Sequence, residues 1–197
     1  MRISRRLVLA SQSPRRVLLL RQIGVNVDVI PSGVPEEFNP LLSPAQNAAT
    51  LALRKAEDVG RNLEDAIVIG ADTIVVVGGE FLGKPESPDD AVRMLELLSG
   101  RTHTVYTGFA LLDRPSNRAV SDVESTLVTF RKLPREEITE YVAGGSPMDK
   151  AGAYGIQDDY GAVFVIRIEG CFYNVVGFPL AKFYMALHDF QVRMTQR

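Results

Sequence analysis

Two adjacent arginines, Arg15 and Arg16, follow the helix-start pair Ser13-Pro14. Serine accepts hydrogen bonds from free backbone N–H groups at a helix N-terminus, and proline suits the first helical position. That end of a helix already carries about half a positive elementary charge, so two arginines there repel it unless an anion lies nearby. A strand, a short loop and a helix N-terminus commonly hold phosphate. The pattern therefore predicts an anion site; the alternative is that both arginines are solvated or pair with a distant acid.

A carboxylate stands between two runs of β-branched residues in "AIVIGADTIVVV", where it is Asp72. Burying an unpaired carboxylate is costly, so Asp72 either emerges at the end of a strand or bonds to a cation or metal. Gly70 allows a close backbone approach, and the apolar flanks place Asp72 on a rigid sheet. The alternative is an ordinary turn aspartate after Gly70.

Three further charged residues are candidates for the same chemistry. Lys84 stands between a glycine and a proline in "FLGKP", on a short constrained loop from which its ammonium could reach a phosphate near Asp72. Glu36 in "PEEF" is a hard oxygen donor of the kind that Mg²⁺ prefers. Lys55 lies beside the apolar stripe of an expected helix and either snorkels or points into a cleft. Taken singly, a solvated loop lysine, a solvated acidic pair and a snorkelling lysine are the alternatives.

The segment "PMDKAGAYGIQDDYGAVFV" is rich in small residues, which suit a backbone folded tightly around a ligand. Its Gln157 offers a donor and an acceptor side by side, and this pattern matches the imide edge of a pyrimidine. The alternative is a glycine-rich loop between strands. His103, His188 and Cys171 have no partner at ligand or triad spacing, so we expect structural roles for them. Without a serine or cysteine nucleophile pattern, hydrolysis by an activated water is favoured over a covalent intermediate.

Composition limits the classes of function. A chain of 197 residues, 46% of them apolar, fits a single domain spanning residues 1–197 with a sizeable core. The net charge of −2 excludes the global basic field typical of nucleic-acid binders. One cysteine excludes an internal disulfide and a cysteine-rich zinc site. No stretch is apolar enough for a signal peptide or a membrane span, which predicts a cytoplasmic protein that does not associate with membranes.

The elements that must position these residues alternate early in the chain, and strands cluster later. Helices are expected at residues 14–23, 44–59, 88–98, 134–144 and from 179 onward. Strands are expected at residues 7–10, 25–30, 66–70, 73–77, 105–113, 125–131, 162–169 and 171–176. Residues 71–72 would interrupt the third and fourth strands, and the last two strands would form a hairpin around Glu169-Gly170. This order predicts an α/β fold with a mixed sheet.

Taken together, six stretches resemble the Maf family of nucleoside triphosphate pyrophosphatases, the septum-formation-inhibitor-like proteins. The stretches stand in the family's order and spacing and span nearly the whole chain: "LASQSPRR", "GADTIVVV", "LGKP", "LSGRTHTVYTG", "MDKAGAYGIQ" and "VVGFPL". The resemblance implies an elongated mixed β-sheet flanked by helices, with two lobes around a central cleft, similar to inosine triphosphate pyrophosphatases of the Ham1 type. It also implies a divalent metal (Mg²⁺, Mn²⁺ or Co²⁺) and a homodimer.

The resemblance assigns roles position by position. Asp72 matches the family's proton acceptor, and Glu36 and Asp72 are the implied metal ligands. Positions that hold phosphate or metal are occupied here by Ser11, Arg16, Glu36, Lys55 and Lys84. Positions that separate subfamilies are occupied by Arg15, Thr73 and Gln157, which is the pattern of the dTTP/UTP branch. Asp158 and Asp159 depart from the family, which usually has glycine after the glutamine.

The implied reaction is metal-assisted attack of water on the α-phosphorus of dTTP or UTP, releasing the monophosphate and pyrophosphate. Modified pyrimidine nucleotides are further candidate substrates, and the implied role is nucleotide house-cleaning or arrest of cell division. The alternative from a different class is a non-catalytic nucleotide-binding regulator of cell division. A nucleic-acid-binding module is disfavoured by the net charge.

Overall fold

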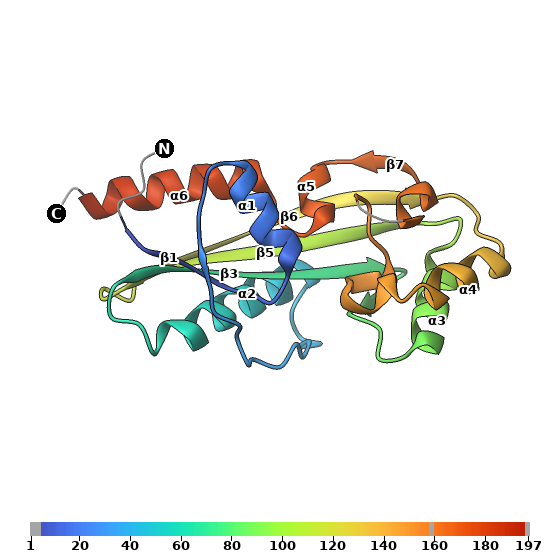
Figure 1. Ribbon diagram of the computed structural model, residues 1–197, viewed down its shortest axis with the longest axis horizontal. Coiled ribbons are helices and arrows are strands. Elements are labelled where there is room, and N and C mark those ends of the chain that lie inside the picture. Colours follow the sequence, from blue (N-terminus) through green and yellow to red (C-terminus); the bar gives the residue numbers. More distant parts are fainter. Residues whose placement is uncertain (1–4, 158–159, 196–197) are drawn as a thin grey trace. The chain divides into compact units, whose positions relative to one another are not determined.

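A computed structural model describes residues 5–157 and 160–195; Asp158 and Asp159 lie outside the described residues. Within that part of the chain, seven strands form one sheet in the order β2-β1-β3-β5-β6-β7, and β4 pairs with β3 (Figure 1). The pairs β1–β2 and β1–β3 are parallel, whereas β3–β4 and β6–β7 are antiparallel. The predicted mixed α/β fold is therefore confirmed. The strands are β1 (Leu7–Ala10), β2 (Asp28–Val29), β3 (Ala66–Val77), β4 (Glu80–Leu82), β5 (Thr102–Arg114), β6 (Ala119–Phe130) and β7 (Val165–Glu169).

The five expected helices are all present, with bounds within one or two residues of those predicted, apart from the open end of the last one. They are α1 (Pro14–Gln22), α2 (Pro44–Gly60), α3 (Pro88–Leu98), α4 (Arg135–Ala143) and α6 (Leu180–Thr195). A short helix α5 and three 3₁₀ turns were not expected: α5 (Phe172–Val176), η1 (Ser146–Asp149), η2 (Ala151–Ala153) and η3 (Tyr160–Phe164). No helix in the described residues is both long enough and apolar enough to cross a membrane.

One predicted interruption is wrong, because β3 runs without a break from Ala66 to Val77. Asp72 was expected to interrupt the strand, since a buried carboxylate needs a partner. It finds that partner in a buried lysine of α2, so the strand continues through it. The expected break at residues 71–72 is thus absent, and one long strand is present, with β4 paired to its second half.

The predicted hairpin around Glu169-Gly170 is also wrong. Gly170, at φ +128°, ends β7, and residues 172–176 form α5 instead of a strand. Periodicity alone cannot distinguish a short apolar run in a strand from one in a helix, and "CFYNVV" is such a run. The expected strand at 25–30 is reduced to Asp28–Val29, and residues 160–164 before β7 form a 3₁₀ turn.

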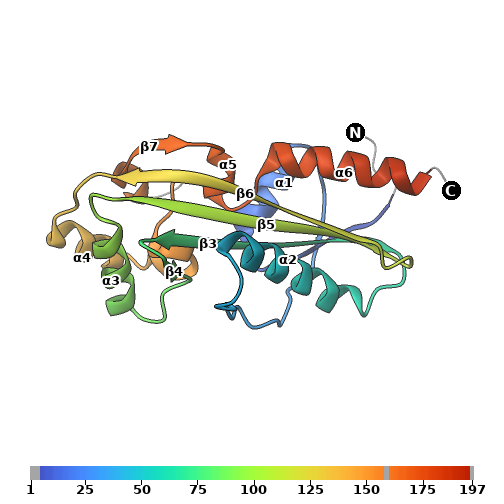
Figure 2. The same ribbon diagram turned by 180° about the vertical axis from the view of Figure 1, so that it is seen from behind.

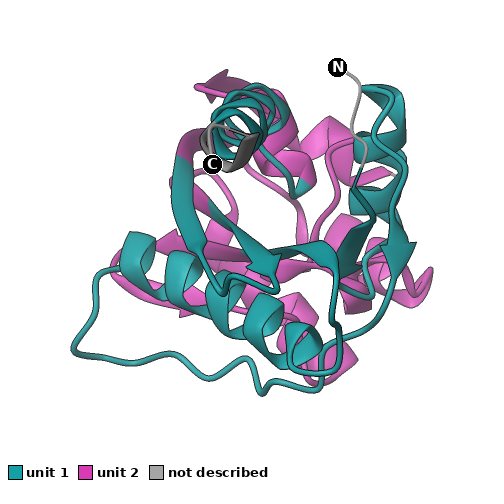
Figure 3. Ribbon diagram, turned by 90° about the vertical axis from the view of Figure 1, so that its left-hand side faces the viewer, with its two compact units in different colours: residues 1–72, 107–124, 177–197 teal, residues 73–106, 125–176 magenta. Residues whose placement is uncertain are grey.

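The chain divides into two compact units (Figure 3). Unit 1 contains residues 1–72, 107–124 and 177–197; unit 2 contains residues 73–106 and 125–176. In unit 1, apolar residues of β1, α2, β3 and β5 form one buried cluster. In unit 2, residues of β3 to β6, α3, α4 and the turns around η2 and η3 form another.

In unit 1, α2 runs along the sheet (Figure 2). Two glycines of the sheet let it approach unusually closely. A Cβ atom built on Gly70 would be 1.9 Å from the carbonyl oxygen of Ala52, and one built on Gly108 would be 2.3 Å from that of Ala48. Only glycine permits this approach, as expected for Gly70. The close packing holds the next turn of α2, which carries Lys55, beside the strand that carries Asp72.

Candidate active site

Lys55 is the centre of a buried ion cluster in unit 1. Its Nζ donates to Oδ1 of Asp72 at 2.6 Å and to Oε1 of Glu36 at 2.7 Å. Lys55 and Asp72 are buried, whereas 40% of the Glu36 side chain is exposed. The structure therefore brings together three residues that the sequence separates by up to 36 positions. Lys55 does not snorkel to solvent, and Asp72 is not a turn residue.

Local hydrogen bonds fix the segments that carry these side chains. Ser43 and Gln46 form a reciprocal capping box at the start of α2, so the helix begins at a defined residue. The buried Asn47 side chain donates to the carbonyl oxygens of Asn39 and Leu42 and accepts from the Asn39 N–H. These bonds fold the loop that follows Glu36 back onto α2. The asparagine was not singled out in the sequence, because nothing in its spacing distinguishes it.

Arg16 joins three separate backbone segments of unit 1. Its Nη1 donates to Ser11 Oγ and to the carbonyl oxygen of Ala71, both at 2.9 Å, and its Nε donates to the carbonyl oxygen of Gly177 at 3.0 Å. Because Arg16 is buried, the alternative of a solvated residue is wrong for it. Ser11 and Arg16 therefore lie together, and Arg16 is bonded to Ala71, the residue that precedes Asp72. Gly177 belongs to the stretch "VVGFPL", for which the sequence indicated no role.

The N-terminus of α1 differs from those of α2 and α3. Ser43 and Ser87 each accept a hydrogen bond from the helix backbone, but Ser13 makes no capping side-chain bond, so the expected serine cap of α1 is wrong. Its ψ is 114°, against 160° and 164° at the other two serines, and its own N–H donates to Ser11 Oγ. Like α2, α1 has no acidic residue in its first turn, whereas α3 has Asp89 and Asp90 there. This helix end keeps the positive character from which an anion site was predicted.

Burial and neighbouring charges act in opposite directions on the titrating groups. Burial raises the pKa of Asp72, the positive charges of Lys55 and Arg16 oppose that rise, and the charge of Glu36 adds to it. Burial likewise lowers the pKa of Arg16, and the charges of Asp72 and Glu36 oppose this. A carboxylate whose pKa is raised is a better proton acceptor, and such groups concentrate at functional sites.

The remaining predicted site residues are distributed over both units. Arg15 is half-buried in the first turn of α1 in unit 1. In unit 2, Thr73 is half-buried in β3, Lys84 is exposed in the loop after β4, and Gln157 is half-buried shortly after η2. Their roles toward a ligand stay predictions.

The donor set fits a divalent cation that is bound together with phosphate. Oxygens of Asp72 and Glu36 meet the same ammonium group within 2.7 Å. Mg²⁺ usually takes one or two carboxylates and completes its coordination with water and substrate phosphates. Among the described residues, no group of three or more His, Cys, Asp or Glu side chains could hold a metal without such help.

Comparison with known proteins places the chain in a family. A sequence model of the family described as Maf-like protein matches residues 6–190. The chain belongs to the Maf-like protein family. The resemblance drawn from the six sequence stretches is thereby confirmed.

Several curated relatives of this Maf-like protein carry the name dTTP/UTP pyrophosphatase. The relative from Moorella thermoacetica is 51% identical over 177 residues, covering 90% of this chain and 91% of the relative. The relative from Caldicellulosiruptor saccharolyticus is 46% identical over 182 residues, with coverage of 90% and 91%. One from Bacillus cereus is 46% identical over 191 residues, with coverage of 97% and 98%.

Proposed function

We propose that this Maf-like protein hydrolyses dTTP and UTP, and modified pyrimidine nucleoside triphosphates, to the monophosphate and pyrophosphate. The observation that carries the proposal is the buried cluster in which Lys55 bonds to Asp72 and Glu36, with Arg16 bonded to the neighbouring Ala71. Cations and a basic carboxylate in one place suit attack on a polyanionic phosphate. The names of the curated relatives support the nucleotide substrate.

In the proposed reaction, Asp72 accepts a proton from water while the water oxygen bonds to the α-phosphorus. The bond from that phosphorus to the bridging oxygen breaks, and pyrophosphate leaves. Lys55, Arg16 and Lys84 neutralise phosphate charge, and Ser11 donates to a phosphate oxygen. Phosphoryl transfer depends mainly on such positioning and charge stabilisation. A bound Mg²⁺, Mn²⁺ or Co²⁺, held by Asp72 and Glu36, would neutralise further phosphate charge.

Gln157 is the proposed reader of the pyrimidine, because its amide offers a donor and an acceptor to the imide edge. Arg15 and Thr73 are proposed to support the same preference for dTTP and UTP. Gln157→Glu should weaken the use of dTTP and UTP, because a carboxylate accepts hydrogen bonds but cannot donate one. Steady-state rates on a nucleotide panel measure this, and an unmodified protein that prefers a purine triphosphate would contradict the base assignment.

The test of the reaction is Asp72→Asn. Loss of a general base lowers rates by about 10²- to 10⁴-fold, so turnover should fall by at least a hundredfold while nucleotide binding survives. Glu37→Gln is the matched control, since Glu37 is an exposed acid next to Glu36. The assay presents the nucleotide panel with Mg²⁺, Mn²⁺ or Co²⁺ and scores monophosphate plus pyrophosphate against orthophosphate. Near-normal hydrolysis by Asp72→Asn would remove Asp72 from its role.

The second candidate is a nucleotide-binding regulator of cell division without turnover. Both candidates bind nucleotide, but only an enzyme releases pyrophosphate over many turnovers. The name that the curated relatives carry, dTTP/UTP pyrophosphatase, favours the enzyme. We also propose that the protein is a cytoplasmic homodimer that binds no nucleic acid. Light scattering measures the oligomeric state, and salt-dependent DNA binding measures the affinity for nucleic acid.

A further inference from the structure

Residues 151–157 lead to the proposed base reader Gln157 through an uncommon backbone conformation in unit 2. Gly152 and Ala153 both have left-handed backbone angles, with φ of +70° and +60°. Ala153 is not a glycine, so its conformation costs about 1 kcal/mol or more unless the surroundings enforce it. Such local strain is typical of segments whose exact path serves a ligand.

Contacts at one end of the segment hold its backbone against the sheet. The Gly152 N–H donates to the carbonyl oxygen of Gly83 at 3.0 Å, and Gly83 directly precedes Lys84. A Cβ atom built on Gly152 would be 3.1 Å from the side chain of Val75 in β3. The segment is therefore pressed onto β3 and bonded to the loop that carries the phosphate-binding candidate Lys84.

Contacts at the other end are made by two buried tyrosine hydroxyls. The Gly155 N–H donates to the hydroxyl of Tyr141 at 3.4 Å, which is a long bond. The Tyr154 hydroxyl is 2.8 Å from Nε2 of His103, and both side chains are buried. Of these two bonds, the one between His103 and Tyr154 has the stronger geometry.

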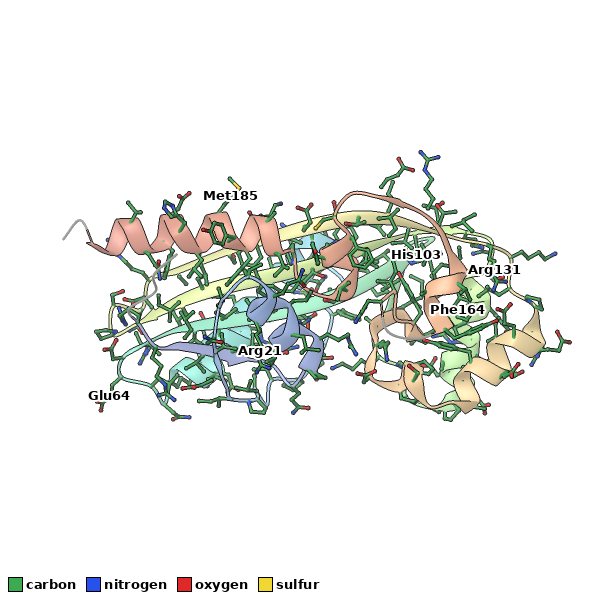
Figure 4. All side chains as sticks on the ribbon, turned by 45° about the horizontal axis from the view of Figure 1, so that its top comes forward. Arg21, Glu64, His103, Arg131, Phe164 and Met185 are labelled. Carbon is green, nitrogen blue, oxygen red and sulfur yellow. The ribbon has the colours of Figure 1, made fainter. Side chains whose placement is uncertain are left out.

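His103 sits in an aromatic cluster that leaves it one polar partner in the described residues. Its ring packs edge-on against Phe130, at 4.9 Å between ring centroids, and against Tyr154, at 5.4 Å. Phe130 packs in turn against Phe164, and Figure 4 labels His103 and Phe164 in this unit. Burial lowers the pKa of His103 to about 4, so the imidazole is neutral at physiological pH. Its Nδ1 is buried without a hydrogen-bond partner among the described residues.

A phenylalanine in place of Tyr154 would fill the same space, so packing alone does not require the hydroxyl. The hydrogen bond adds direction, because it fixes how far Tyr154 enters the cluster and thus where the following residues run. A satisfied polar pair in a buried site specifies one arrangement more strictly than apolar contact does. Gln157 is three residues further along the same segment.

We propose that His103, acting through the Tyr154 hydroxyl, positions the segment that carries Gln157 and thereby sets recognition of the pyrimidine base. In this proposal His103 and Tyr154 are positioning residues, which act through the backbone path of residues 154–157 and not on the reacting phosphate or the water. The inference rests on the proposed function insofar as Gln157 reads the base. It extends that function to two residues for which the family stretches "LSGRTHTVYTG" and "MDKAGAYGIQ" indicated no chemistry.

The test compares Tyr154→Phe with Thr126→Val in the full chain. Both variants remove one buried hydroxyl of unit 2 and nearly preserve side-chain volume. Thr126 Oγ1 bonds to Asn174 and to the backbone of Cys171, next to α5, and these bonds lie outside residues 151–157. Two ligands separate base from phosphate: thymidine 5′-monophosphate contains the base, and inorganic pyrophosphate does not.

Tyr154→Phe should weaken binding of thymidine monophosphate and raise KM for dTTP, each roughly two- to tenfold, as expected for one buried hydrogen bond. Its kcat should stay within about twofold and its affinity for pyrophosphate should not change, since the phosphate groups are untouched. Thr126→Val should leave all four quantities unchanged. His103→Gln should remain closer to the unmodified protein than His103→Leu, because an amide can still meet the Tyr154 hydroxyl.

Equal effects of Thr126→Val and Tyr154→Phe would overturn the inference, as would a fall in kcat with KM and monophosphate binding unchanged. The two histidine variants decide the matter if Tyr154→Phe does not fold, since equal behaviour of His103→Gln and His103→Leu would also overturn it. An unmodified protein that releases no pyrophosphate from dTTP contradicts the proposed function instead. Binding of thymidine monophosphate to the same variants still tests the positioning role in that case.

Discussion

Replacing Lys55 with methionine tests the ion cluster most directly. The methionine keeps the aliphatic volume of the side chain but removes the ammonium that bonds to Asp72 and Glu36. Asp72 then stays buried as a carboxylate without its nearest cation, whereas Glu36 can turn to solvent because 40% of its side chain is already exposed. Breaking a buried ion pair by removing one partner costs about 3–5 kcal/mol. For a chain of this length that loss corresponds to a fall in Tm of roughly 6–20 °C.

The loss should depend on pH in a direction set by Asp72. Burial already raises the pKa of Asp72, and the positive charge of Lys55 opposes the rise, so Lys55→Met raises that pKa further. A carboxyl whose folded pKa lies above its unfolded value binds its proton more tightly in the folded state. The contribution of this tighter proton binding to the free energy of unfolding is complete below the unfolded pKa and is lost as pH rises through the folded pKa. Lys55→Met should therefore be nearest to the unmodified protein in acid and least stable at neutral and alkaline pH.

The assay is urea unfolding at several pH values, with a double-variant cycle. Lys55→Met combined with Asp72→Asn should recover most of the lost stability, because the unpaired buried charge is gone. If the double variant is no more stable than Lys55→Met alone at neutral pH, an unpaired Asp72 is not the source of the loss. A loss that is the same at all pH values would refute the reasoning as well, since it would reflect packing alone.

Three further predictions follow from local geometry. Ser43→Ala should lower the free energy of unfolding in urea by about 1 kcal/mol, because it breaks the capping box of α2. Ser13→Ala should lower it much less, since Ser13 makes no capping side-chain bond. Equal losses would contradict the capping assignment. Gly70→Ala should destabilise the protein by about 3 kcal/mol or more, because its Cβ would lie 1.9 Å from the Ala52 carbonyl oxygen, while Gly33→Ala has open space and should stay within about 0.5 kcal/mol. Burial lowers the folded pKa of His103 to about 4, from the ordinary 6.5, so protonating the protein favours the unfolded state. The free energy of unfolding should therefore fall by about 3 kcal/mol, a loss that begins near pH 6.5 and grows as pH falls toward 4. His103→Gln should flatten that part of the stability profile, and an unchanged slope between pH 6.5 and 4 would refute the assignment.

The helices were predictable because their signals are local. Each of the first three begins at a serine-proline pair, and this pair gives the same start residue in sequence and structure. The conformation of Ser13 was not predictable in the same way. The Ser13 N–H donates to Ser11 Oγ. Arg16, three residues further on, donates to the carbonyl oxygens of Ala71 and Gly177. These two bonds of Arg16 span 55 and 161 positions along the chain, so a local sequence pattern cannot indicate them.

The sequence identified Asp72 as a carboxylate in need of a partner but could not decide what the partner was. The two apolar runs on either side of Asp72 indicated two strands with a break at the charge. The break is absent because Lys55, which lies in a helix 17 residues earlier, satisfies that charge. The prediction of a strand at residues 171–176 was wrong for a related reason. Its β-branched and aromatic residues favour a strand, but its buried Asn174 donates to Val105 and Thr126, and the segment forms a helical turn. In both places tertiary contacts override local preference.

The ion cluster is difficult to explain by stability alone. Replacing a buried ion pair with apolar residues of similar volume is often neutral or stabilising, so Asp72, Lys55 and Arg16 are a costly way to fill the interior of unit 1. Their arrangement makes sense if the cluster exchanges partners. Lys55 holds the buried carboxylate of Asp72 and that of Glu36, whose side chain is 40% exposed. An arriving phosphate displaces Glu36 more easily, because the freed carboxylate can turn to solvent and leaves no charge unpaired in the interior. We infer that phosphate displaces Glu36 from Lys55 while Asp72 keeps its bond to Lys55, so that binding the substrate charge leaves the proton acceptor in place.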